Sequence, residues 1–229
     1  MDTLQNILFV GPVLLFSVIA HEYAHGYAAL RQGDPTAKSL GRLTWNPVKH
    51  IDPYMTVILP LVMLVASKGQ FALGGAKPVP VDPRNYRNYR RGDIIVSLAG
   101  VFTNLLVALA CTAVIVPTGL LARAVPPVGP TLAIVQAMLI LGVGINLLLI
   151  AFNLIPIPPL DGSHVMKYLL PRSLAVRYQQ IGASGLVILI ALLVFGLLDL
   201  WLRPALIVSQ YLIGWVRPYV LPGAWQWLA

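Results

Sequence analysis

Long stretches without charged side chains restrict this chain to a membrane fold. A helix needs roughly 20 apolar residues to cross the hydrocarbon layer of a bilayer. Four stretches reach or approach this length, and the first of them contains a single charged residue, Glu22: Thr3–Leu30, Ile94–Leu121, Leu132–Leu160 and Ile181–Leu198. Only 10% of the 229 residues are charged, against about 25% in soluble domains. We therefore expect an all-α, multi-pass integral membrane protein.

Two further apolar segments are shorter, and a third is rich in glycine and proline. Pro204–Val216 has aromatic residues at its edges, which are typical of membrane interfaces, and we interpret it as a fifth, tilted span. Tyr54–Ser67 is too short to span and contains a proline, which favours a re-entrant or interfacial segment. Phe71–Val81 is predicted to form a short β-hairpin-like stretch.

Three clusters of basic residues indicate how the helices are oriented. They follow the first span, precede the second and follow the third: Arg31, Lys38, Arg42 and Lys49; Lys68, Lys77, Arg84, Arg87, Arg90 and Arg91; Lys167, Arg172 and Arg177. By the positive-inside rule all three should be cytoplasmic. The N-terminus is then outside, and Tyr54–Ser67 should enter and leave by the same face or lie at the interface.

The net charge of +8 and the tyrosines within the run 84–91 also raise the possibility of nucleic-acid binding. The run lies directly before a membrane span, which favours a topology signal and contact with anionic lipids. We expect no nucleic-acid partner.

The pattern His21-Glu22-Tyr23-Ala24-His25 lies at the cytoplasmic end of the first predicted helix. On a helix, imidazoles at positions i and i+4 share one face and can bind one metal ion, while the glutamate between them can reach a water on that ion. In a soluble helix this short pattern can arise by chance, but a solvated polar face is a poor explanation inside an apolar run. We predict one Zn²⁺ bound by His21 and His25, with Glu22 as general base.

The predicted topology also indicates a third metal ligand. The helix 132–160 runs from outside to inside and delivers Asp161 to the depth of the two histidines. No other carboxylate lies between Asp93 and Asp199, and an unpaired charge at a helix end in the membrane is costly. The Asp-Gly pair alone would indicate a turn. With the histidines nearby, we predict that Asp161 is the third zinc ligand, which leaves the fourth position for water.

The segment from Asn153 to Gly162 has the pattern NxxPxPxxDG. Together with the HExxH pattern it resembles the site-2 protease family of intramembrane zinc metalloproteases. Residues 41–53 and 76–81 extend the likeness to the compact branch without a PDZ domain, from about residue 7 to residue 170. Residues 97–104 resemble the AGPxxN segment of the family, except that Val101 stands where proline is usual.

The resemblance implies a zinc metalloprotease that cleaves peptide bonds in or near transmembrane segments, as in regulated intramembrane proteolysis. It implies that Asn153 holds the unwound substrate, with Asn104 as a second candidate, although both amides could simply connect helices. The expected partners are a transmembrane protein or peptide substrate and the lipid bilayer. The expected location is a prokaryotic cell membrane, with the active site near the cytoplasmic face. Residues 1–170 would form the protease core and residues 171–229 accessory transmembrane helices.

Two other functions remain open at this point. A metal transporter would also place histidine and aspartate in a membrane, but with ligands along a path. A catalytically silent scaffold would bind membrane helices without cutting them. His50 and His164 are expected to have supporting or structural roles, because the predicted zinc already has three protein ligands. The sequence indicates neither the substrate nor the oligomeric state.

Overall fold

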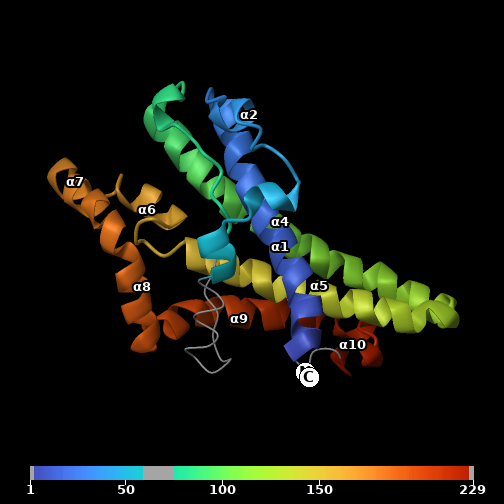
Figure 1. Ribbon diagram of the computed structural model, residues 1–229. Coiled ribbons are helices and arrows are strands. Elements are labelled where there is room, and N and C mark those ends of the chain that lie inside the picture. The colour runs from blue at the N-terminus through green and yellow to red at the C-terminus, as the bar shows by residue number, and fades with distance from the viewer. Residues whose placement is uncertain (1–2, 59–74, 227–229) are drawn as a thin grey trace. The chain divides into compact units, whose positions relative to one another are not determined.

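The computed structural model describes residues 3–58 and 75–226, and within these ranges every regular element is helical (Figure 1). The chain divides into two compact units. The first contains Met1–Ser17 and Val101–Ala229, and the second contains Val18–Gly100. Helices α1 (Thr3–Gln32) and α4 (Tyr89–Ala124) each contribute one part to each unit. The predicted division at residue 170 stays a prediction.

Three helices of the described residues are long and apolar enough to cross a membrane: Leu8–Gln32 within α1, Tyr89–Ala124, and Pro126–Asn153, which joins η4 (Pro126–Val128) to α5 (Gly129–Asn153). They correspond to the first three predicted spans. The expected end of the third span at Leu160 is wrong. Helix α5 ends at Asn153 because Pro156, Pro158 and Pro159 lack the N–H groups that a continuing helix requires.

The predicted span Ile181–Leu198 is not one continuous helix. Its residues lie in a short turn, η5 (Ile181–Ser184), in α8 (Gly185–Val194) and at the start of α9 (Leu197–Val216). The break falls at Gly196, whose φ of 70° is a left-handed conformation that glycine adopts readily. Helix α8 makes an angle of 78° with α7 (Arg172–Gln180), so the two form at most one broken span.

The predicted fifth span, Pro204–Val216, lies within α9. This helix is not among those of the described residues that are long and apolar enough to cross a membrane. About five transmembrane helices therefore remain a prediction.

In the first unit, α5 packs along α9 and against α10 (Pro222–Gln226) (Figure 1). Two buried clusters join these helices to the second part of α4: Ala108, Val143, Leu147 and Ala205; Ile115, Ile140, Val216 and Ala224. Alanines at these contacts let the helix backbones approach closely, which is how membrane helices gain packing energy.

Gln136 of α5 connects α4 and the turn between α9 and α10 through polar contacts. Its side chain is fully buried, and Nε2 donates to the carbonyl oxygens of Ile115 (3.1 Å) and Tyr219 (3.0 Å). Its Oε1 accepts from the backbone N–H of Leu221 at 2.7 Å. The buried amide is thus hydrogen-bonded at both ends, as such groups are in stable folds.

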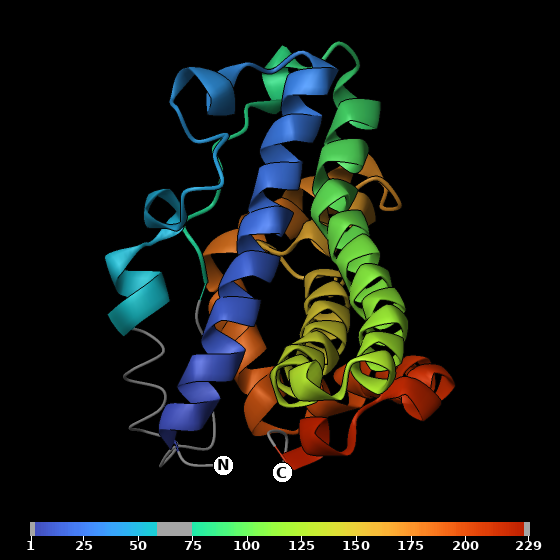
Figure 2. The same ribbon diagram turned by 90° about the vertical axis from the view of Figure 1, so that its right-hand side faces the viewer.

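In the second unit, the later part of α1 and the first part of α4 lie side by side (Figure 2). Ala29 and Val96 bury the aromatic ring of Tyr86 between these helices. Four short helical segments complete the described part of the unit: α2 (Thr36–Ser39), η1 (Pro47–His50), η2 (Pro53–Ile58) and η3 (Pro83–Asn85).

The segments predicted to re-enter the membrane and to form a hairpin are only partly described. Residues 54–58 lie in η2, and residues 59–67 are outside the described residues. Of the hairpin-like stretch, residues 71–74 are outside the described residues too, while residues 75–81 have no regular secondary structure. No β-strand occurs within residues 3–58 and 75–226.

Candidate metal centre

The structure brings His21 and His25 together on one face of α1. Their Nε2 atoms are 2.9 Å apart, and their rings meet edge to face with an interplanar angle of 81°. A tetrahedral zinc ion with Zn–N distances of about 2.0–2.1 Å holds two ring nitrogens about 3.3 Å apart. The pair is therefore within a few tenths of an ångström of the spacing that a shared metal ion requires.

The second ring nitrogen of His25 is oriented by helix α4. Nδ1 lies 2.7 Å from the backbone carbonyl oxygen of Val96. Because a carbonyl has no proton to give, Nδ1 must be the donor, and the neutral imidazole then carries its lone pair on Nε2. A backbone carbonyl that fixes the tautomer of a histidine in this way is typical of metal ligands.

His21 lies against Gly100, also on α4. A Cβ built on Gly100 would lie 2.5–2.6 Å from three atoms of the imidazole ring, closer than real Cβ contacts allow. Val96 and Gly100 are four residues apart, so one face of α4 contacts both histidines. The sequence predicts no role for Gly100, although this residue belongs to the segment 97–104 that resembles AGPxxN.

Glu22 is held by a segment far away in the sequence. Its Oε2 accepts a hydrogen bond of 2.8 Å from the backbone N–H of Val79, which is buried. Val79 lies between Pro78 and Pro80 in the segment 75–82, which has no regular secondary structure. No sequence pattern assigned this donor, because a backbone N–H is common to all residues except proline.

The other predicted site residues belong to the first unit. Asp161 is the first residue of α6 (Asp161–Met166). Asn153 is the last residue of α5, and its Nδ2 donates to the carbonyl oxygen of Leu149 at 2.9 Å. Asn104 is fully buried in α4, and neither polar atom of its side chain forms a hydrogen bond to any residue that the structure describes.

The two additional histidines have different surroundings. His50 is buried and its Nε2 donates to the carbonyl oxygen of Thr44 at 2.9 Å, which connects two parts of one loop. His164 lies in α6 and lines a cavity of about 200 Å³ together with Lys167 and Tyr178.

Residues 10–119 and 125–194 match the family model described as Peptidase family M50. The chain belongs to this family. "Putative zinc metalloprotease YwhC" of Bacillus subtilis (strain 168) is 34% identical over 193 residues, which cover 82% of both chains. "Putative zinc metalloprotease Rip2" of Mycolicibacterium smegmatis is 30% identical over 210 residues, which cover 87% of this chain and 74% of the relative. No solved structure matches the chain.

Family M50 is the site-2 protease family, so the family predicted from the HExxH and NxxPxPxxDG patterns is confirmed. Its activity, intramembrane proteolysis with zinc, is the activity that the sequence predicted. The family and the three apolar helices together make this chain an integral membrane protein in contact with the lipid bilayer. The histidine pair, the tautomer of His25 and the space left by Gly100 fit a zinc ion.

Proposed function

We propose that this M50 peptidase is an endopeptidase whose zinc ion is held by His21, His25 and Asp161 and whose general base is Glu22. The observation that carries the proposal is the histidine pair. Its two Nε2 atoms lie 2.9 Å apart, and the Val96 carbonyl leaves the Nε2 of His25 free of a proton. When bound, zinc supplies the chemistry that activates a water molecule and polarises a peptide carbonyl.

The role of Asp161 is supported by its place in the NxxPxPxxDG pattern and by its chemistry. A carboxylate added to two imidazoles makes the three-ligand set of catalytic zinc sites, which keep the fourth position open for water. Asp161 begins α6 directly after the proline-rich turn that ends the third apolar helix. That turn would therefore set the position of the ligand relative to the membrane.

The proposed role of Glu22 is proton transfer. Its Oε2 accepts the Val79 N–H at 2.8 Å, which holds the carboxylate in one orientation. The carboxylate takes the proton of the attacking water and returns it to the amine that leaves. The Glu22 carboxylate must be within hydrogen-bond reach of the water in the first transfer and of the leaving amine in the second, so a carboxylate held in one orientation suits both.

We propose a single-span membrane protein as the substrate. Its target segment must unwind, because the carbonyls of an intact helix are hydrogen-bonded and shielded. Asn153 is proposed to accept a backbone N–H of the extended segment through Oδ1, since its Nδ2 already donates to Leu149. Asn104 is the second proposed contact, and its complete burial means that a neighbouring side chain must move before it can meet a substrate.

The proposed orientation places the basic clusters in the cytoplasm of a prokaryotic cell, the N-terminus outside and the active site near the cytoplasmic face. The bent pair α7 and α8 would be a fourth crossing and α9 a fifth. This orientation follows from the distribution of lysine and arginine, and cysteine labelling of the loop around residue 128 from the outside would test it.

Glu22→Gln in purified protein reconstituted into liposomes tests the catalytic proposal. The variant should retain one zinc per chain and lose cleavage of a single-span peptide that the wild type cuts. Asp199→Asn, which changes an exposed carboxylate in α9, serves as the matched control and should keep both properties. Normal cleavage by Glu22→Gln would exclude Glu22 as the base, and wild-type protein without zinc would exclude the metal site.

A further inference from the structure

The segment 75–82, which has no regular secondary structure and which we call the strap, lies against the later part of α1. Gly26, one helical turn after Glu22, provides the space for it. A Cβ built on Gly26 would lie 2.8 Å from Cγ1 of Val79. The strap therefore packs on the face of α1 that carries Glu22 and Gly26, with the Val79 N–H directed at the Glu22 carboxylate.

The two prolines of the strap determine which residue can face Glu22. Pro78 and Pro80 have no backbone N–H, so Val79 is the single donor within the run Pro78-Val79-Pro80. A shift of the strap by one residue in either direction would place a proline nitrogen at the carboxylate, and no hydrogen bond could form. The sequence thus permits one register of the strap against α1.

Contacts at both ends hold this register. Toward the start of the strap, the N–H of Lys77 donates to the carbonyl oxygen of His50 at 2.8 Å. The Arg42 guanidinium donates to the carbonyl oxygens of Lys77 and Pro78 at 3.0 and 3.3 Å. At the other end, the N–H of Asp82 donates to Oδ2 of Asp34 at 2.7 Å.

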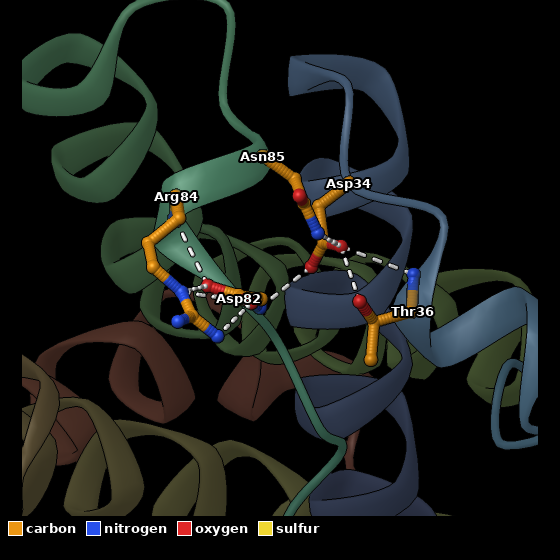
Figure 3. Close-up of polar contacts among 5 residues, drawn as sticks. All are labelled: Asp34, Thr36, Asp82, Arg84 and Asn85. Carbon is orange, nitrogen blue, oxygen red and sulfur yellow. Dashed lines mark hydrogen bonds and ion pairs between the residues drawn. The ribbon is translucent and has the colours of Figure 1, made fainter.

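Asp34 is the centre of the network at this second end (Figure 3). It is fully buried, and its Oδ1 accepts from Oγ1 of Thr36 at 2.5 Å and from Nδ2 of Asn85 at 2.9 Å. Its Oδ2 accepts the strap. Asp34 follows α1 almost directly, at the turn where Gly33 has a φ of 115°. One helix therefore carries Glu22 and leads directly into the residue that anchors the strap.

We propose that Asp34 is a positioning residue for Glu22, acting through the strap. By fixing the N–H of Asp82, Asp34 keeps Val79 three residues earlier in register with the Glu22 carboxylate. The carboxylate is then oriented for proton transfer before any substrate binds. This inference rests on the proposed role of Glu22 as general base.

Asp34→Asn is the sharpest test. The asparagine keeps the shape and one acceptor oxygen for Thr36 and Asn85, but its NH₂ group would face the Asp82 N–H and cannot accept it. Asp82→Asn is the matched control, because among the described residues the Asp82 side chain forms hydrogen bonds only with Arg84, and the substitution keeps the backbone N–H that Asp34 holds. Val79→Pro removes the donor to Glu22 directly.

The kinetics would be measured in liposomes with a quenched-fluorescent single-span peptide that the wild type cleaves. Asp34→Asn and Val79→Pro should each lower kcat at least about tenfold with KM and zinc content unchanged, because the lost hydrogen bond involves a charged group. Asp82→Asn should match the wild type. The double variant Asp34→Asn/Val79→Pro should have the same kcat as Val79→Pro alone, because both changes act on the same hydrogen bond from the Val79 N–H to Glu22.

Hydrogen exchange gives a second measurement that does not depend on the proline variant folding. The amides of Val79 and Asp82 should exchange faster in Asp34→Asn than in the wild type or in Asp82→Asn. Wild-type kcat in Asp34→Asn, or multiplying effects in the double variant, would overturn the inference. If Glu22→Gln is inactive while these variants are normal, only the inference fails. If Glu22→Gln remains active, the proposed function itself fails.

Discussion

Gly100 of α4 lies in direct contact with the imidazole ring of His21, leaving no room for a side chain. Gly100→Ala should therefore displace the ring and weaken zinc binding. Changes next to a metal ligand typically cost about 10–100-fold in affinity. Competition with a chromogenic zinc chelator would measure the zinc affinity of the variant. Gly214→Ala is the control, because nothing lies within 4 Å of its added Cβ. Equal zinc affinity in both variants would contradict the prediction.

Gln136→Leu should destabilise the first unit. The leucine leaves the part-buried N–H of Leu221 and carbonyl of Tyr219 without the partner that Gln136 provides. A polar group left unsatisfied away from water costs about 1–3 kcal/mol. Thermal unfolding in detergent would show the loss, and Gln180→Leu at an exposed position should change stability by less than about 0.5 kcal/mol. An unchanged unfolding temperature for Gln136→Leu would show that water or lipid replaces the amide.

Asp34 should make stability depend on pH. Burial opposes ionisation of its carboxyl, but the hydrogen bonds from Thr36, Asp82 and Asn85 outweigh burial and lower its pKa below the ordinary 3.8. A lowered folded-state pKa adds stability above the unfolded value, and this stability is lost as pH falls through the folded pKa. The wild type should therefore exceed Asp34→Asn in free energy of unfolding near neutral pH.

The difference between the two proteins should narrow below pH 3.8, the ordinary pKa of the carboxyl. Unfolding measured from neutral to acidic pH in the same detergent tests this. A difference that stays constant across the range would mean that the ionised carboxylate adds no stability beyond that of the amide.

Gly185→Ala should disrupt the turn that carries the NxxPxPxxDG pattern. A Cβ on Gly185 would overlap the carbonyl oxygen of Pro158, a backbone atom that cannot move without the turn. We expect loss of cleavage and a lower unfolding temperature. Gly129→Ala, with nothing within 4 Å of the added Cβ, is the control. If Gly185→Ala has normal activity and stability, α8 can move away from the turn without cost. That result would support the predicted protease core of residues 1–170, which does not include α8.

The predicted helices were most accurate where the apolar runs were long. Leu8–Gln32 and Tyr89–Ala124 agree with the first two predicted spans because a continuous apolar run of this length has few alternatives in a membrane. Ends and breaks were less predictable. The predicted third span continues through Pro156 to Leu160, and the predicted span Ile181–Leu198 includes the bend at Gly196, because apolarity alone does not report backbone conformation.

The sequence alone determined the chemistry of this protein, because helical periodicity places His21 and His25 on one face of any helix that contains them. Only the tertiary structure decided what surrounds them. His25 is oriented by the backbone carbonyl of Val96, 71 residues away, and Glu22 by the backbone N–H of Val79, 57 residues away. Such backbone groups occur in nearly every residue, so no sequence pattern marks them. Local patterns specify local geometry, whereas such distant backbone contacts depend on how whole segments pack.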